Sequence, residues 1–264
     1  MLILPPGSSL PFWTAALAAC LSLAFPLSAQ VTETPQTMEP GSVLVKMDAF
    51  SFGVEPDTDA PNQYKATLIG NTLLYAGLSS TVDVEAGFQL FVHDSFTLNH
   101  NEQTQSGLGS FTVRPKWMFW SDASSGQAAA AMPYVIVPTN QSITGTKSVQ
   151  GGVIVPYSIS MGEGATAAAM VELDELRNLA DTRYDTHLYA SGVMKWSLGS
   201  TLSAYGEATL QGSTGGSETD LGTLGGGATF SLSKNFEWDF EVSKVLGQGR
   251  NSWAEVLRFR WKLL

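Results

Sequence analysis

Charged side chains that alternate with bulky apolar ones have the clearest chemical potential in this sequence. The chain ends in LRFRWKLL, so Arg258, Arg260 and Lys262 fall on one side of an extended segment. In FEWDFEV, Glu237 and Asp239 likewise share a side. Because alternate residues of a strand point to the same face, both segments are predicted to be strands with one charged face and one apolar face.

Opposite charges also face each other when neighbouring strands are folded into hairpins. One hairpin turns near residues 248–249 and the other at the loop 93–108. The predicted pairs are Asp239 with Arg258, Glu237 with Arg260, Glu85 with Arg114, and Asp83 with Lys116. Each such pair contributes roughly 0.2–1 kcal/mol. Two interpretations stay open: the pairs neutralise one another in a narrow interior, or they line a pore and set its ion selectivity.

Further side chains are assigned to the same polar faces, namely Tyr134, Tyr189, Tyr205 and Glu207. The tyrosines, together with Met132, could form an amphipathic path for an aromatic solute. The alternative is that they fill space and hydrogen-bond to their neighbours, as tyrosines commonly do.

Enzyme chemistry has weak support in the sequence. The segment HDS at 93–95 suggests a serine activated by a histidine, but it lies at the edge of a loop and adjacent strand residues point to opposite faces. The other histidines, His100 and His187, show no metal-ligand spacing, and no helix follows the glycines at 225–227 to hold a phosphate. We therefore predict no catalytic, cofactor-binding or metal-binding residues, and no cofactor.

The elements that must position these residues are strands. Beyond residue 42 apolar residues recur with period two, which indicates half-buried strands. In the clearest case one face is formed by Val82, Val84, Ala86, Phe88, Leu90 and Val92, and Phe91 is the one apolar residue on the other face. About twelve such segments occur, each close to the ~9–11 residues that a tilted strand needs to cross a bilayer. They are 43–52, 63–76, 82–92, 109–119, 128–137, 149–158, 165–173, 186–197, 201–211, 222–232, 236–245 and 253–264.

The connections between these segments alternate in length. Short ones are predicted at 77–81, 121–127, 159–164, 198–200 and 233–235, and longer, mostly acidic ones at 53–62, 93–108, 138–148, 174–185, 211–221 and 247–252. Short periplasmic turns and long extracellular loops are typical of bacterial outer-membrane barrels, and an even number of strands leaves both ends on the periplasmic side. The predicted fold is an all-β, antiparallel, up-and-down transmembrane barrel over residues 42–264.

A soluble β-sandwich is the alternative, because it also has strands with one apolar face. Two features favour the barrel. Only 14% of the residues are charged, against roughly 25% in soluble domains. Aromatic residues also gather where strands meet the short turns, as expected for an interfacial girdle: Phe119, Trp196, Phe236, Trp238 and Trp261.

The first residues indicate export. An apolar run over 10–24, a proline and a small residue before Gln30 predict a signal peptide over 1–29, cleaved after Ala29. The stretch LAAC17–20 leaves lipidation of Cys20 as an alternative. Residues 30–41 are then a short periplasmic segment before the first strand. A net charge of −10 disfavours nucleic-acid binding, which requires clustered cations.

Several phrases resemble a known family. They are NTLLYAGLSSTVDVEAG (71–87), GLGSFTVRPKW (107–117), AAAMPYVIVPT (129–139) and GGVIVPYSISM (151–161). They are similar to the bacterial outer-membrane family labelled transporter or "Putative MetA-pathway of phenol degradation", and the likeness covers about 40–264. The resemblance implies an outer-membrane pore or uptake protein, with phenol degradation as an inherited label.

Together these observations predict a channel in the bacterial outer membrane that passes small, hydrophobic or aromatic solutes by passive diffusion. The expected partners are outer-membrane lipid, the solute, and the barrel-assembly machinery during biogenesis. A structural or adhesive barrel that binds a partner or lipid through acidic loops is the alternative, and an outer-membrane hydrolase is a third.

Overall fold

The computed structural model describes most of the chain after the leader. The described parts are residues 31–56, 63–98, 101–139, 148–178, 182–214, 221–246 and 252–264. The predicted signal peptide, its cleavage site and the lipidation of Cys20 lie outside these residues. Within them there is no helix long and apolar enough to span a membrane.

The regular elements of the described parts are β-strands. Their bounds are β1 Val43–Pro56, β2 Gln63–Gly77, β3 Val82–Leu98, β4 Asn101–Gly107, β5 Phe111–Asp122, β6 Gln127–Val137, β7 Gln150–Gly162, β8 Ala165–Arg177, β9 Tyr184–Ser197, β10 Leu202–Ser213, β11 Leu221–Ser233, β12 Phe236–Leu246 and β13 Trp253–Lys262. The half-apolar alternation recognised in the sequence therefore produces strands throughout, most of them longer than predicted.

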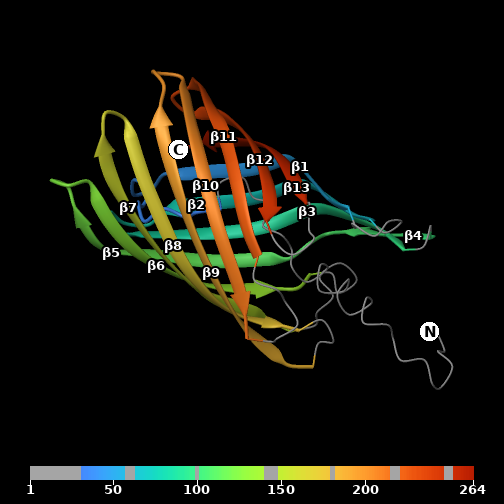
Figure 1. The fold of residues 1–264 in the computed structure, drawn as a ribbon. Coiled ribbons are helices and arrows are strands. Elements are labelled where there is room, and N and C mark those ends of the chain that lie inside the picture. The colour runs from blue at the N-terminus through green and yellow to red at the C-terminus, as the bar shows by residue number, and fades with distance from the viewer. Residues whose placement is uncertain are drawn as a thin grey trace.

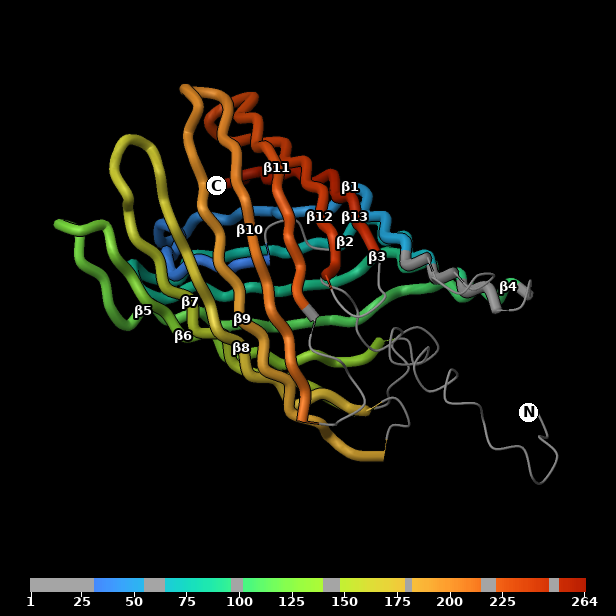
Figure 2. Tube along the Cα trace, viewed as in Figure 1, coloured from blue at the N-terminus to red at the C-terminus, as the bar shows by residue number. Residues whose placement is uncertain are grey.

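The strands close into one antiparallel barrel (Figures 1 and 2). Sequence neighbours pair around the ring, and β1 closes it by pairing with β13. β4 and β5 both pair with β3 and lie in line, interrupted at 108–110, so together they form one position of the ring. The result is a closed barrel of twelve strands, which confirms the predicted fold class.

The barrel is apolar outside and polar inside. Leu210, Phe240 and Trp261 are exposed, whereas charged residues such as Glu85 and Arg258 are fully buried. A soluble protein has the opposite arrangement. An outward apolar band around a polar interior is the arrangement of an outer-membrane barrel, because lipid cannot solvate charge.

The two ends of the barrel differ as predicted. Residues 78–81, 123–126, 163–164, 198–201 and 234–235 form the short turns. The start of β1 and the end of β13 lie at this same rim, since Leu44 lies opposite Lys262. Aromatic rings line the rim: Phe236, Trp238 and Phe259 contact one another, as do Trp117 with Phe119 and Trp120 with Tyr157.

Two predicted loops contain strand. The connection expected at 93–108 is largely a hairpin, in which β3 continues to Leu98 and pairs with β4; it projects from the end of the barrel opposite the C-terminus (Figure 2). β8 likewise extends to Arg177, so part of the loop expected at 174–185 belongs to the wall.

The alternation in β2 and β3 changes phase at Gly70 and Leu90. Gly87 and Gln89 follow the inward phase of β3, but beyond Leu90 the phase is reversed, so Val92 is buried and Phe91 is exposed. The prediction that Val92 shares the outer face with Leu90 is therefore wrong. Gly70 has a φ of +68°, a conformation that only glycine adopts without strain. One irregular position thus reverses the faces of two paired strands.

The described residues before β1 lie against the inner wall. The main chain of Val31 and Thr32 contacts Glu207, at mid-height of β10. The chain then passes Ser158 of β7, to which Gln36 donates at 2.7 Å, and reaches the short-turn rim, where the Gly41 amide donates to Gly77. We call residues 31–41 the inner segment; the sequence assigned 30–41 to a periplasmic segment.

Candidate functional site

The inner wall, lined by the predicted polar faces, is the candidate site. Glu85 of β3 lies between two bases of β5: its carboxylate is 2.7 Å from Arg114 Nη2 and 3.1 Å from Lys116 Nζ. The register places Glu85 opposite Arg114 and Asp83 opposite Lys116, as predicted. Lys116 nevertheless forms its ion pair with Glu85 and not with Asp83, the residue opposite it. Asp83 accepts instead from the main-chain amide of Met38, 3.0 Å from each carboxylate oxygen.

The basic residues of β13 are also paired. The predicted register holds, with Arg258 opposite Asp239 and Arg260 opposite Glu237. Arg260 Nη1 is 3.1 Å from Glu237. Arg258 Nε is 2.5 Å from Asp48 of β1, on the other side of β13. An inward arginine on β13 has neighbours on both sides, and hairpin counting from the sequence considers only one of them.

Lys262 links the end of β13 to the inner segment. Its Nζ is 2.9 Å from Glu39. This hydrogen bond and the charge of Lys262 lower the pKa of Glu39. Since both side chains are well exposed, the pair adds little to stability.

Tyr205 shows how the tyrosines are used. It lies opposite Gly227 of β11, where a side chain would overlap its hydroxyl. The ring therefore passes over β11, and its hydroxyl lies 3.0 Å from Asp239 and 3.1 Å from Glu241 of β12. A tyrosine, a facing glycine and two acids on the next strand form a unit, and this explains one glycine of the run at 225–227.

The same unit occurs a second time in the wall. Tyr134 of β6 lies opposite Gly152 of β7, and Gly152 lies opposite Asp174 of β8. The Tyr134 hydroxyl donates to Glu172 at 2.8 Å and also to Asp174. Each of these two acid pairs in the wall thus receives a tyrosine hydroxyl as a hydrogen-bond donor.

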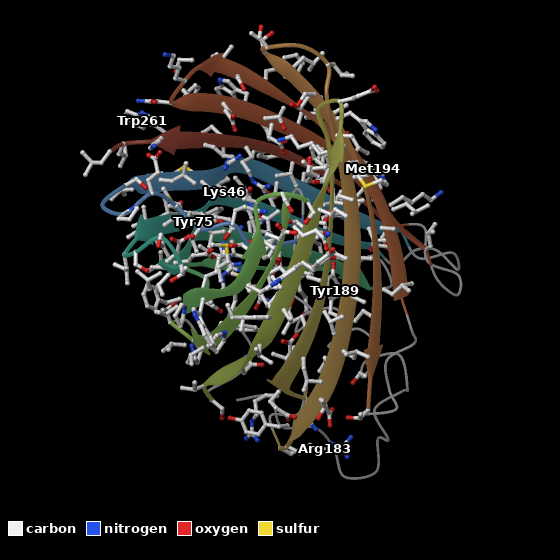
Figure 3. All side chains as sticks on the ribbon, turned by 90° about the vertical axis from the view of Figure 1, so that its left-hand side faces the viewer. Lys46, Tyr75, Arg183, Tyr189, Met194 and Trp261 are labelled. Carbon is white, nitrogen blue, oxygen red and sulfur yellow. The ribbon has the colours of Figure 1, made fainter. Side chains whose placement is uncertain are left out.

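Tyr189 belongs to an apolar patch of the interior. It packs, with Ile136 and Val31, against a buried cluster formed by Met132, Tyr134, Ile154 and Met170. We call this cluster the methionine patch. Figure 3 shows Lys46, Tyr75 and Tyr189 within the barrel, with Trp261 and Arg183 toward its opposite ends.

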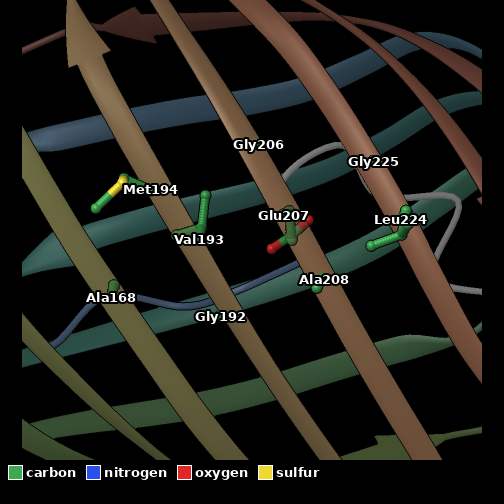
Figure 4. A pocket seen from close by; sticks show the side chains of 9 residues that line it. All are labelled: Ala168, Gly192, Val193, Met194, Gly206, Glu207, Ala208, Leu224 and Gly225. Atoms are coloured by element: carbon green, nitrogen blue, oxygen red, sulfur yellow. The ribbon is translucent and has the colours of Figure 1, made fainter.

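Glu207 anchors the inner segment. Its carboxylate accepts from the amides of Val31 and Thr32, at 2.9 and 2.5 Å. The Thr32 hydroxyl donates to Ser191 at 2.8 Å. The small residues around Glu207 line a wide-open hollow of about 590 Å³, to which the exposed Leu224 also contributes (Figure 4). Its lining is Ala168, Gly192, Val193, Met194, Gly206, Glu207, Ala208, Leu224 and Gly225.

The predicted lining residues make the contacts described above with other wall residues or with the inner segment, but some of their partners were missed. Lys46 and Asp48 alternate with apolar residues in VLVKMDAF, and Glu172 and Asp174 do so in VELDEL, so a signal was present. Glu33 had none, because nothing periodic precedes the first strand.

The candidate hydrolase residues do not form a catalytic pair. His93 Nδ1 is 2.6 Å from Ser106, while Ser95 donates to Glu102. No group of three or more His, Cys, Asp or Glu in the described parts is arranged to hold a metal ion.

Comparison with known proteins identifies the family. The sequence matches the family model "Putative MetA-pathway of phenol degradation" over residues 29–263. The chain belongs to this family. The match confirms the resemblance that the sequence motifs indicated. None of the curated proteins compared with it matches.

Solved structures share the fold of this family member. An outer membrane channel from Pseudomonas putida F1 has a TM-score of 0.65 at 12% identity, covering 87% of this chain and 98% of that one. The translocator domain of the autotransporter NalP from Neisseria meningitidis gives 0.60 at 9%, covering 94% and 97%. The NanC porin gives 0.52 at 10%, covering 81% and 100%. With the apolar outer face, these likenesses place the chain among bacterial outer-membrane barrels, the predicted location.

Proposed function

We propose that the protein is a passive outer-membrane channel for small solutes. The observation that carries this proposal is the inner wall of the closed barrel, where charged pairs, tyrosines and hydroxyl residues replace the apolar packing of an ordinary core. A polar interior of this kind gives water and polar solutes a surface they can wet, and rings of charge set ion selectivity. The likeness to outer-membrane channels and porins supports the same class.

The methionine patch supports solutes that carry an aromatic or aliphatic group. Met132 is fully buried and Met170 nearly so, within an otherwise polar wall. Methionine is a flexible, polarisable side chain that adapts to aromatic surfaces. Val31 and the Glu33 amide of the inner segment cover this patch, so a solute with one apolar and one polar end would contact the patch and the charged pairs together once the segment moves aside.

Reconstitution into liposomes tests the channel directly. We expect osmotic swelling in small sugars above the rate for protein-free vesicles, and a conductance in planar bilayers. Phenyl β-glucoside should enter faster than methyl β-glucoside once size is allowed for, and Met132→Gln should reduce that preference while swelling in sugars continues. Heat-unfolded protein is the control. Permeability no greater than that of the control would overturn the channel proposal.

A further inference from the structure

Two residues of the inner segment, Val31 and Glu33, contact two different parts of the wall. Glu33 Oε1 lies 3.0 Å from Arg114 Nη2, with both side chains largely buried. Val31 packs on the methionine patch. One end of this short stretch is therefore a carboxylate held by a guanidinium, and the other is an apolar group on an apolar surface.

Glu33 balances the charge of a basic cluster. Arg114 and Lys116 lie on Glu85, Lys116 also acts on Asp83, and Lys46 is close enough to act electrostatically on Glu33. Lys46 also faces Asp48, which Arg258 holds on its other side, while Arg114 contacts two carboxylates, those of Glu85 and Glu33. Removal of Glu33 therefore takes one of two carboxylates away from Arg114 and leaves a place for the carboxylate of a solute.

The contacts that hold this part of the segment can be exchanged for water or solute. They are the main-chain hydrogen bonds to Glu207, the Thr32–Ser191 hydrogen bond and a weak bond from the Glu33 amide to Met170 Sδ at 3.2 Å. None is covalent. The Arg114 fork suits carboxylates by geometry, since two parallel N–H groups match two oxygens.

We propose that Arg114, with Lys46 and Lys116, is a binding site for the carboxylate of a small amphipathic monocarboxylate, whose apolar end lies on the methionine patch. Glu33 and Val31 occupy the two halves of this site until the solute displaces them. Two residues of chain span at most about 7 Å, which suits an acid such as 3-phenylpropanoate. The inference rests on the proposed function, because the solute reaches this site through the lumen.

A tethered competitor weakens binding of the free solute. A short flexible tether gives an effective concentration in the millimolar range. The solute must compete with Glu33 at that concentration, so loss of the Glu33 carboxylate is expected to raise the apparent affinity at least tenfold. Loss of the Arg114 guanidinium should abolish the preference for a carboxylate.

Calorimetric titration of the folded full-length protein in detergent tests these expectations without requiring conduction. The probes are 3-phenylpropanoate, its uncharged amide 3-phenylpropanamide, and acetate, which lacks the apolar end. Glu33→Gln is compared with Glu39→Gln, the same change farther along the segment. Arg114→Gln is compared with Arg183→Gln, an exposed arginine near the opposite rim.

The proposal expects 3-phenylpropanoate to bind Glu33→Gln at least tenfold more tightly than it binds Glu39→Gln, and far more tightly than the amide or acetate binds. Equal affinity for the acid and the amide in Glu33→Gln would overturn it, and this comparison stands even if Arg114→Gln does not fold. Conduction without a preference for the carboxylate would support the proposed function and contradict this inference. Binding of the acid without conduction would support this inference and contradict the proposed function.

Discussion

At the residue scale, the wall satisfies buried acids in two ways. Glu85 lies on Arg114 and Lys116, so its charge is compensated by bases. Asp239 and Glu241 accept hydrogen bonds from the Tyr205 hydroxyl. Asp239 also accepts one from the Thr229 hydroxyl, at 2.8 Å. Buried acids without a donor are costly, so these hydroxyls stabilise the wall.

Tyr205→Phe should destabilise the barrel, because it removes the hydroxyl while leaving the ring and the two acids in place. We expect a loss of about 1.5–3 kcal/mol in the free energy of unfolding, the contribution of a hydrogen bond to a charged group. Urea titration in detergent or lipid vesicles, followed by tryptophan fluorescence, measures it.

The matched control is Tyr157→Phe, since the Tyr157 hydroxyl bonds Gln127 on an exposed part of the barrel. Its expected effect is within about 0.5 kcal/mol, as for most surface changes. If the two variants unfold at the same urea concentration, the hydroxyl of Tyr205 contributes nothing to the acid pair.

At the scale of strands, faces are set by alternation and by the positions where alternation fails. The charged and apolar faces of β12 and β13 follow the sequence without interruption. β2 and β3 change phase together at Gly70, whose positive φ allows the reversal. A β-carbon there would also lie 2.8 Å from Leu90 Cδ1.

Gly70→Ala should therefore lower stability by two separable effects. The left-handed backbone conformation costs roughly 1–2 kcal/mol for a residue with a side chain, and the contact with Leu90 adds to it. The double variant Gly70→Ala/Leu90→Ala should remove the contact with Leu90 Cδ1 but keep the cost of the backbone conformation. Gly206→Ala, which meets open space, is the control and should unfold like wild type; equal losses for Gly70→Ala and Gly206→Ala would contradict the role of Gly70.

The outer face of β13 gives a prediction that depends on depth. Leu257 lies in the middle of the strand and Leu263 just beyond its end, and both are exposed. Leu257→Arg should cost about 2–4 kcal/mol and Leu263→Arg about 0–1 kcal/mol, because the penalty for a charge falls from the bilayer midplane to its interface. The yield of heat-modifiable folded protein in lipid vesicles should fall for the first variant alone. Similar yields for both would place Leu257 away from the lipid core.

At the scale of the whole molecule, the inner segment joins strands that are distant around the ring. Glu207 of β10, Arg114 of β5 and Lys262 of β13 all contact it. The segment therefore fills part of the interior, and the carboxylate site proposed above requires that it move.

Thr32→Cys/Ser191→Cys should lock the segment to β9. The two hydroxyl oxygens are 2.8 Å apart, near enough for a disulfide of ~2.05 Å after a small adjustment. Oxidation should lower the affinity for 3-phenylpropanoate at least tenfold, since Glu33 can no longer leave Arg114, and a reducing agent should restore it. Calorimetric titration before and after reduction measures the change.

Wild-type protein given the same oxidant and reductant is the control for the locked variant. Unchanged binding in the fully oxidised variant, with the crosslink verified by mass spectrometry, would show that the segment need not move for the acid to bind.

Much of this protein can be derived from its sequence, because the signals involved are local. Alternation along a strand determined which residues of β12 and β13 face inward, and turn positions determined that Arg260 meets Glu237 and Arg114 meets Glu85. The tertiary structure alone decided contacts that cross the ring or lie outside the periodic pattern. Arg258 lies on Asp48 because ring closure brings β1 beside β13. Glu33 reaches Arg114 because a segment without periodicity folds back along the inner wall, where the charge of the bases stabilises it.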